Sequence, residues 1–382
     1  MGSFTILSFS IADILFTILI LIFTVCAYLL DLKRPANAVL VIFLLVWLLV
    51  PLLHFSHSKA TFFRHLFFVP TILVLYYGRG NSNASLFGNF ATGMAGLVSA
   101  LYPDKIEILQ KVGSQNPRPC PPEIHCEIVE LENFKIELYS YEGSPKRTLL
   151  YGIHGASHFT PLTNLYRKFS QKLANRYRDT LVAAVDPRSS LDHPYPAALD
   201  DVLAGYHHLL SQGFDPKQVV LMGDSSGGNL VLALCHRLIA AGEPLPAGLV
   251  LVSPQTNLTQ SGESYISRYH LDPILGNMTD QVDAKKRIEI HYAKGEDKTN
   301  PFISPLFGDF TGFPPTLIQV GEYEILYDDS RQLFEKMKNA GVDVRLTQYP
   351  GMVHDFQLMF PELVPEVKHA RQEIRSFLGE YL

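Results

Sequence analysis

The stretch VVLMGDSSGGNLVLAL, Val219–Leu234, decides the fold that this sequence predicts. Its apolar first half is typical of a buried strand, and its apolar second half is typical of a helix. Between them lie Ser225 and Ser226, in a run of small residues that fits the pattern G-x-S-x-G. We predict that Ser225, at the sharp turn, presents its hydroxyl as a nucleophile and that Ser226 contributes its backbone N–H. A glycine-rich turn with helix-capping serines is the alternative.

The chain on both sides of this stretch alternates strand and helix patterns from about residue 120 onward. Such alternation predicts an α/β fold with a mostly parallel sheet of eight strands and helices on both faces. Residues 255–312 interrupt the alternation and predict an insertion that covers the carboxyl end of the sheet as a lid. The expected strands are Glu127–Leu131, Lys135–Tyr139, Thr148–Ile153, Thr180–Val185, Gln218–Met222, Gly248–Val252, Thr316–Val320 and Asp343–Tyr349. The expected helices are Pro161–Tyr177, Ala197–Gln212, Ser226–Ala241, Tyr327–Ala340 and Glu362–Leu382.

A serine hydroxyl needs a base, and a base histidine needs a carboxylate that orients it. His354 lies in a loop directly after the last expected strand, which places it at the carboxyl edge of the sheet; His193 and His291 lack such a position. Glu324 lies just past the preceding strand and is the expected acid, with Asp328 as the alternative. The sequence therefore predicts a Ser225–Glu324–His354 triad.

Donors for a developing oxyanion are expected in the loop that leaves the strand Thr148–Ile153. The small residues Gly155 and Ala156 expose backbone N–H groups there, so we predict an oxyanion hole made by these two amides and that of Ser226. His154 is expected to order the turn by hydrogen bonding rather than to transfer a proton.

The N-terminal part carries the surplus apolarity. Residues 14–30 and 38–53 contain no charged side chain and are joined by a short polar turn with Lys33 and Arg34. Each run is close to the length of a membrane-spanning helix, so we predict a membrane hairpin over residues 1–56. A cleaved signal peptide and a pair of buried core helices are the alternatives.

The segment after the hairpin predicts contact with the membrane surface. Residues 62–77 are apolar but include Arg64 and Pro70, which favour an interfacial segment over a spanning one. We assign residues 57–119 to an interfacial or cap segment and 120–382 to a catalytic domain. Glycosylation sequons at Asn83, Asn257 and Asn277 favour a lumenal catalytic domain on the endoplasmic reticulum membrane.

Composition excludes several other classes of protein. The net charge is −5 and no long basic run is present, which argues against nucleic acid as a partner. The 4 cysteines have no metal-site spacing and are too few for a disulfide scaffold. Cys120 and Cys126 either form a disulfide in an oxidising compartment or remain free thiols.

With these residues assigned, the chain from about Leu149 to its end resembles the hormone-sensitive-lipase group of α/β-hydrolases, which includes arylacetamide deacetylases and fungal steryl acetyl hydrolases. The resemblance rests on five pieces in order: HGAS, HPYPAALDDV, GDSSGGNL, EILYDDS and HDF. Two features depart from the group. Ala156 and Ser157 replace glycines of the usual oxyanion motif, and Glu324 stands where the acid is usually aspartate.

The resemblance implies ester hydrolysis through an acyl-enzyme, with no metal and no cofactor. A membrane anchor beside such a site suggests lipophilic ester substrates, for which acetates of alcohols such as sterols are the first expectation. A broader lipase or xenobiotic esterase is the enzymatic alternative, and a non-catalytic ligand-binding protein with a hydrolase fold is the alternative of another class.

Overall fold

A computed structural model describes residues 83–101, 116–117, 119–276 and 291–382. The expected membrane hairpin 1–56, the apolar segment 62–77 and the sequon at Asn277 lie outside these ranges. Within the ranges, no helix combines the length and the apolar character that crossing a membrane requires.

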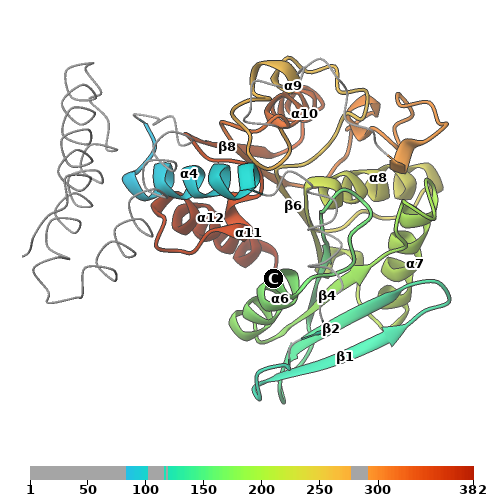
Figure 1. Ribbon diagram of the computed structural model, residues 1–382. Coiled ribbons are helices and arrows are strands. Elements are labelled where there is room, and N and C mark those ends of the chain that lie inside the picture. The colour runs from blue at the N-terminus through green and yellow to red at the C-terminus, as the bar shows by residue number, and fades with distance from the viewer. Residues whose placement is uncertain (1–82, 102–115, 118, 277–290) are drawn as a thin grey trace, which may run out of the picture.

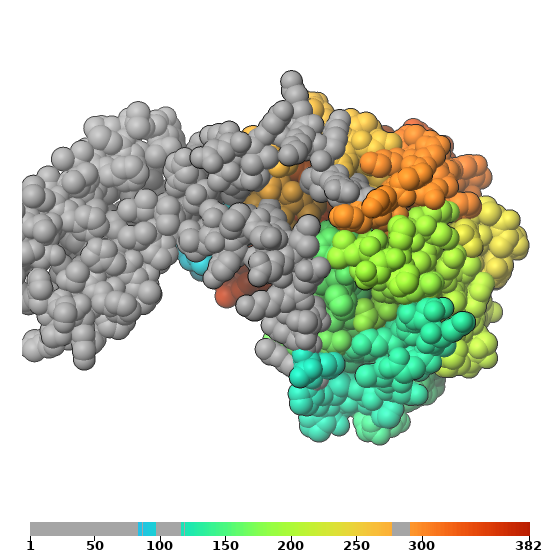
Figure 2. Space-filling view, turned by 45° about the vertical axis from the view of Figure 1, so that its right-hand side comes forward, coloured from blue at the N-terminus to red at the C-terminus, as the bar shows by residue number. Residues whose placement is uncertain are grey.

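The described residues form one sheet of eight strands in the order β1-β2-β4-β3-β5-β6-β7-β8. Strand β2 pairs antiparallel with both β1 and β4, and all the other neighbouring strands pair parallel. The prediction of a mostly parallel α/β sheet is therefore confirmed. In Figure 2 the β1–β2 hairpin, coloured blue-green, forms one edge of the molecule. The strands are β1 Ile124–Glu130, β2 Lys135–Tyr141, β3 Thr148–Ile153, β4 Thr180–Asp186, β5 Val219–Asp224, β6 Gly248–Val252, β7 Thr316–Gly321 and β8 Val344–Tyr349.

Helices cover both faces of the sheet (Figure 1). Helices α7, α8 and α10 contribute to the core on one face, and α6 and α12 contribute to the core on the other. The helices are α4 Leu86–Leu101, α6 Asn164–Arg176, α7 Ala197–Ser211, α8 Ser225–Ala241, α9 Ser264–Ser267, α10 Tyr327–Asn339, α11 Phe356–Met359 and α12 Pro365–Tyr381. The five long helices expected after residue 120 are present, with ends displaced by three residues or fewer.

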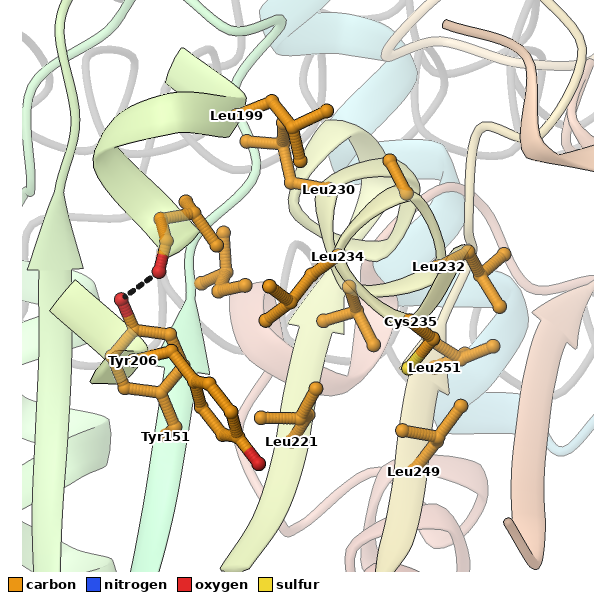
Figure 3. Close-up of a cluster of buried hydrophobic side chains, with 14 of the residues drawn as sticks. Tyr151, Leu199, Tyr206, Leu221, Leu230, Leu232, Leu234, Cys235, Leu249 and Leu251 are labelled. Carbon is orange, nitrogen blue, oxygen red and sulfur yellow. Dashed lines mark hydrogen bonds between the residues drawn. The ribbon is translucent and has the colours of Figure 1, made fainter. Parts of the chain in front are cut away.

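The central strands are apolar along their whole length because both of their faces are covered. All six residues of β5 are buried, and alternate residues enter different cores: Leu221 faces α8, whereas Val220 faces the side of α12. Figure 3 shows Leu230 and Leu234 of α8 among the side chains that pack with Leu221 in this core. Tyr151 of β3 is also buried there, and its hydroxyl donates to the carbonyl of Val202. These contacts fix the register between the nucleophile-bearing strand and the helix after it.

Helix α4 lies beside α11 and α12, although more than 250 residues separate them in the chain (Figure 1). The backbone N–H and the hydroxyl of Ser85 both donate to the Glu366 carboxylate. The hydroxyl of Thr92 donates to the Gly351 carbonyl at 2.8 Å. The helix therefore holds the loop that carries His354, a contact that the sequence did not predict.

The insertion 255–312 is described in two pieces, 255–276 and 291–312. Asn229 of α8 donates through Nδ2 to the carbonyls of Gln255 and Ile303, which ties both pieces to this helix. Figure 2 shows the second piece, in orange, against the light-green region of the molecule. Just before α7, the Tyr195 N–H donates to the Tyr292 carbonyl at 2.9 Å. Opening and closing of this insertion as a lid stays a prediction.

Two expectations about the surface are settled by the described residues. A disulfide joins Cys120 and Cys126. The expectation that the sequon at Asn257 is a glycosylation site is wrong. Asn257 is only 2% exposed, and its Nδ2 donates to Ser261. Thr259 donates to the Asn257 Oδ1 from both its N–H and its hydroxyl, so the sequon forms a closed local network.

Candidate active site

Ser225 occupies the turn between β5 and α8 in a left-handed conformation, with φ of 50°. Two glycines make this turn sterically feasible. A Cβ at Gly223 would lie 2.5 Å from the Gly227 carbonyl oxygen, and a Cβ at Gly227 would lie 2.0 Å from the Ile153 carbonyl oxygen. Since real Cβ atoms do not approach so closely, only glycine lets the turn pass beside the end of β3. The small residues around the serine therefore serve the geometry that the sequence predicted.

The structure brings Ser225, His354 and Glu324 into one hydrogen-bonded chain. The His354 Nε2 lies 2.9 Å from the Ser225 Oγ, and its Nδ1 lies 3.0 Å from a Glu324 carboxylate oxygen. The three residues come from the carboxyl ends of β5, β8 and β7, which meet at one edge of the sheet. All three are buried, and Glu324 is 0% exposed.

The second oxygen of Glu324 is held by its surroundings. It accepts a hydrogen bond from the Gly321 N–H and one from the Ser253 hydroxyl at 2.7 Å. Asp328, the alternative acid, does not contact the histidine, because its carboxylate accepts from the Ser264 N–H at 2.9 Å. The glutamate therefore has the position that an orienting acid requires.

The oxyanion loop departs in one respect from the expectation. The Gly155 N–H donates to the Asp224 carboxylate at 3.1 Å, so the prediction that this amide serves the oxyanion hole is wrong. Gly155 instead permits close packing, because a Cβ there would lie 3.0 Å from the Ser225 Cβ. Across the described ranges no hydrogen bond uses the N–H of Ala156 or of Ser157. The Ser226 N–H lies in the first turn of α8, where helix amides have no partner within the helix.

The loop is strained at three consecutive residues. The φ angles of Ala156, Ser157 and His158 are 74°, 64° and 63°. Residues other than glycine rarely adopt this left-handed backbone conformation. The His158 N–H donates to the Ser226 hydroxyl at 3.1 Å, and the His158 ring stacks on Tyr292 with centroids 4.1 Å apart. Burial and the neighbouring His154 lower the pKa of His158 to about 3, so its ring is neutral and packs as an aromatic group.

His154 orders the start of this loop. Its Nδ1 lies 2.9 Å from the Gly155 carbonyl oxygen, and its Nε2 lies 3.6 Å from an Asp186 carboxylate oxygen. Burial lowers the pKa of His154, but the nearby Asp186 carboxylate outweighs burial, so that the net effect raises this pKa. The ring contacts the loop backbone and lies outside the chain of Ser225, Glu324 and His354.

Sequence reasoning missed two carboxylates beside the site. Asp224 directly precedes the nucleophile and accepts from the Gly155 N–H and, at 2.6 Å, from the Tyr166 hydroxyl. Burial, followed by the charge of Asp355, raises the pKa of Asp224 to about 7. Asp355 directly follows the base, and one of its oxygens lies 3.1 Å from the His354 Nε2. The sequence did contain a signal for these two carboxylates, because an aspartate stands next to the nucleophile in GDS and next to the base in HDF.

A serine at a strand-to-helix elbow, with a histidine and a carboxylate at the carboxyl edge of a mostly parallel eight-stranded sheet, defines the α/β-hydrolase class. The chain belongs to this family, because the family model described as "alpha/beta hydrolase fold" matches residues 150–358.

Relatives at the level of sequence are esterases and acetyl-hydrolases. The chain is 39% identical to an esterase of Acinetobacter venetianus over 60% of this chain and 74% of that protein. It is 38% identical to an acetyl-hydrolase of Streptomyces hygroscopicus over 61% of this chain and 75% of that protein.

A solved esterase from the bacterial hormone-sensitive lipase family superposes with a TM-score of 0.67 and 31% identity, covering 78% of this chain and 98% of that one. The chain is thus a carboxylic ester hydrolase of the hormone-sensitive-lipase group. A closer kinship with steryl acetyl hydrolases or arylacetamide deacetylases stays a prediction.

Proposed function

We propose that this chain is a membrane-anchored serine esterase that removes short acyl groups, acetyl first, from lipophilic alcohols such as sterols. The observation that carries the catalytic part is the unbroken contact from Glu324 through His354 to Ser225, with links of 3.0 and 2.9 Å. The likeness to the acetyl-hydrolase of Streptomyces hygroscopicus supports a short acyl group.

In the proposed mechanism Ser225 attacks the ester carbonyl carbon while His354 Nε2 accepts the hydroxyl proton. The negative charge that develops on the carbonyl oxygen is held by the amides of Ala156, Ser157 and Ser226. His354 then donates its proton to the leaving alcohol, and an acyl-enzyme remains on Ser225. Water, deprotonated by the same nitrogen, attacks this acyl-enzyme and releases the acid. Glu324 keeps the imidazole in the required orientation throughout.

Access from a bilayer is proposed from the apolar surroundings of the base loop. Exposed apolar side chains lie on the elements next to this loop: Phe87 and Met94 on α4, Met359 on α11 and Leu363 just before α12. The charge-free runs at residues 14–30 and 38–53 supply the proposed anchor. A lipophilic ester that partitions into the bilayer would then reach the site without crossing water.

We propose a lumenal catalytic domain on the endoplasmic reticulum membrane. The Cys120–Cys126 disulfide supports an oxidising compartment, and Asn83 offers an exposed sequon. Glycosidase treatment of the full chain should increase its gel mobility, and Asn83→Gln should remove part or all of that change. Unchanged mobility of the wild type would argue against the lumenal placement.

The decisive experiment is a hydrolysis panel with the membrane-bound full chain. Acetyl, butyryl and long-acyl esters of a sterol and of an aryl alcohol are compared, with Ser225→Ala as the control. The proposal predicts the highest kcat/KM for the sterol acetate and loss of all turnover in the control. A preference for long acyl chains would indicate a lipase, equal rates on both alcohols a broad esterase, and no turnover of any ester a ligand-binding protein.

A further inference from the structure

His354 Nε2 has a second polar neighbour besides the nucleophile. The Asp355 Oδ2 lies 3.1 Å from this nitrogen, and the Ser225 Oγ lies 2.9 Å from it. The direction of the Asp355 side chain follows from its backbone, which is left-handed with φ of 53° and ψ of 27°. Aspartate tolerates this region better than most residues, so the chain can place a carboxylate beside the ring that immediately precedes it.

The two neighbours favour opposite protonation states of Nε2. A neutral ring whose Nδ1–H donates to Glu324 has a lone pair on Nε2, which accepts the Ser225 hydroxyl proton. That lone pair would face the Asp355 carboxylate, and two acceptors repel each other. A protonated ring instead forms a close ion pair with the Asp355 carboxylate, which favours the charged form.

We propose that Asp355 is a positioning residue that competes with Ser225 for His354: its charge stabilises the protonated imidazole and thereby sets the pH above which the base becomes available. In the proton cycle, the Nε2–H bond formed when Ser225 attacks is stabilised by Asp355. The bond breaks when this proton passes to the leaving alcohol, so Asp355 itself gains and loses no proton. The inference rests on the proposed serine-esterase function.

The other charged groups around this nitrogen do not take over the role. Glu324, from the turn after β7, contacts the opposite ring nitrogen. Asp224, at the end of β5, accepts from Tyr166 of α6 and from the loop backbone. The second Asp355 oxygen is buried and, among the residues that the structure describes, has no hydrogen-bond partner. Asp355 is therefore the carboxylate that acts directly on Nε2.

The balance of interactions on the imidazole agrees with this geometry. Burial lowers the pKa of His354, but the charge of the adjacent Asp355, followed by the hydrogen bond and charge of Glu324, outweighs burial and raises the pKa well above its ordinary value. A protonated base cannot accept the Ser225 proton, so we expect the rise of kcat/KM to lie at higher pH than the titration of an ordinary histidine.

The test compares the pH profile of kcat/KM for the full-length wild type, Asp355→Asn and Asp328→Asn. Asparagine also tolerates the left-handed region, and it carries no charge that would stabilise the protonated ring. Since a neighbouring opposite charge shifts a pKa by about one pH unit or more, the acidic limb of Asp355→Asn should move down by at least about that much. At one pH unit below the wild-type midpoint, kcat/KM of Asp355→Asn, divided by its own plateau value, should be about fivefold the same ratio for the wild type. Asp328→Asn removes one carboxylate that does not touch His354 and should keep the wild-type limb.

A limb at the same pH in wild type and Asp355→Asn, or an equal movement in Asp328→Asn, would overturn the inference. Asp355→Gly, which also suits a positive φ, provides a second variant without the carboxylate should the asparagine variant fail to fold. The rate at which a fluorophosphonate labels Ser225, measured against pH, reports the protonation of His354 without an ester substrate. If no ester is hydrolysed but labelling occurs, the proposed function fails, while the labelling limb still decides the role of Asp355.

Discussion

At the scale of single residues, Glu324 is a longer acid than the aspartate usual in the group, and its neighbours make the length usable. Gly321 and Ser253 hold one carboxylate oxygen, which leaves the other 3.0 Å from the His354 Nδ1. Glu324→Gln should keep the fold but favour the wrong tautomer of the histidine, so we expect kcat on a chromogenic acetyl ester to fall by about 10³-fold or more. Asp328→Asn should retain nearly full activity. The reverse ranking of the two variants would reassign the acid.

The Ser226 side chain is the second residue with a testable effect, because its hydroxyl accepts from the His158 N–H at the end of the strained loop. Ser226→Ala should let that loop relax, and the loss of one hydrogen bond predicts a fall in kcat of about tenfold with little change in KM. Glycines relieve the strain at positive φ. In an Ala156→Gly, Ser157→Gly background the same Ser226→Ala change should therefore cost much less. An equal cost in both backgrounds would show that the hydroxyl does not act through the loop.

At the scale of elements, α4 is a helix from the N-terminal part that supports the base loop. Thr92 is 1% exposed, and its hydroxyl donates to the Gly351 carbonyl, three residues before His354. Thr92→Val keeps the shape of the side chain but leaves this carbonyl unpaired, which should lower the free energy of unfolding by about 1–3 kcal/mol. Amide hydrogen exchange in residues 350–356 should accelerate. Thr299→Val, where the hydroxyl contacts an exposed aspartate, is the matched control; similar exchange in both variants would contradict the supporting role.

At the scale of the whole molecule, the sequence was sufficient for the sheet, for the family and for the chain positions of the reactive side chains. Strands buried on both faces are continuous apolar runs, as β5 and β7 are, and parallel strands must end at one edge. Contacts between segments that are far apart in the chain, by contrast, have no periodic pattern in the sequence from which they could be predicted. The Ser85–Glu366 pair joins residues 281 positions apart, and both side chains are common on any helix surface.

The directions of individual N–H groups and side chains in the loops of the site could not be predicted from the sequence either. Whether the Gly155 N–H faces the oxyanion or Asp224, and whether Asp355 faces solvent or the histidine, depends on a few dihedral angles of two loops. Residue types alone do not determine those angles. The burial of Asn257 has the same origin, since a sequon describes three residues and not their surroundings.

The stability of the whole molecule should depend on pH through Asp329, a buried acid outside the reactive chain. Its carboxylate accepts from the N–H groups of Thr256 and Asn257, yet burial outweighs these bonds and raises its pKa to about 7. In the unfolded chain the same group loses its proton near pH 3.9. Between these values the folded state binds more protons, so the contribution of Asp329 to stability is full below about pH 4 and is lost as the pH rises toward 7.

Asp329→Asn keeps an acceptor for both N–H groups and cannot ionise, so it should flatten this part of the stability profile. Urea unfolding of the detergent-solubilised full chain at pH 4.5 and 7.5 should show a decrease in the free energy of unfolding that is smaller in Asp329→Asn than in the wild type, by on the order of 2–3 kcal/mol. Asp328→Asn, one residue earlier on the same helix, should keep most of the wild-type decrease, because the charge of Asp328 raises the pKa of Asp329 less than burial does. An unaltered pH dependence in Asp329→Asn would mean that this carboxylate ionises in the folded protein as readily as in the unfolded chain, and that the hydrogen bonds from the insertion compensate fully for its burial.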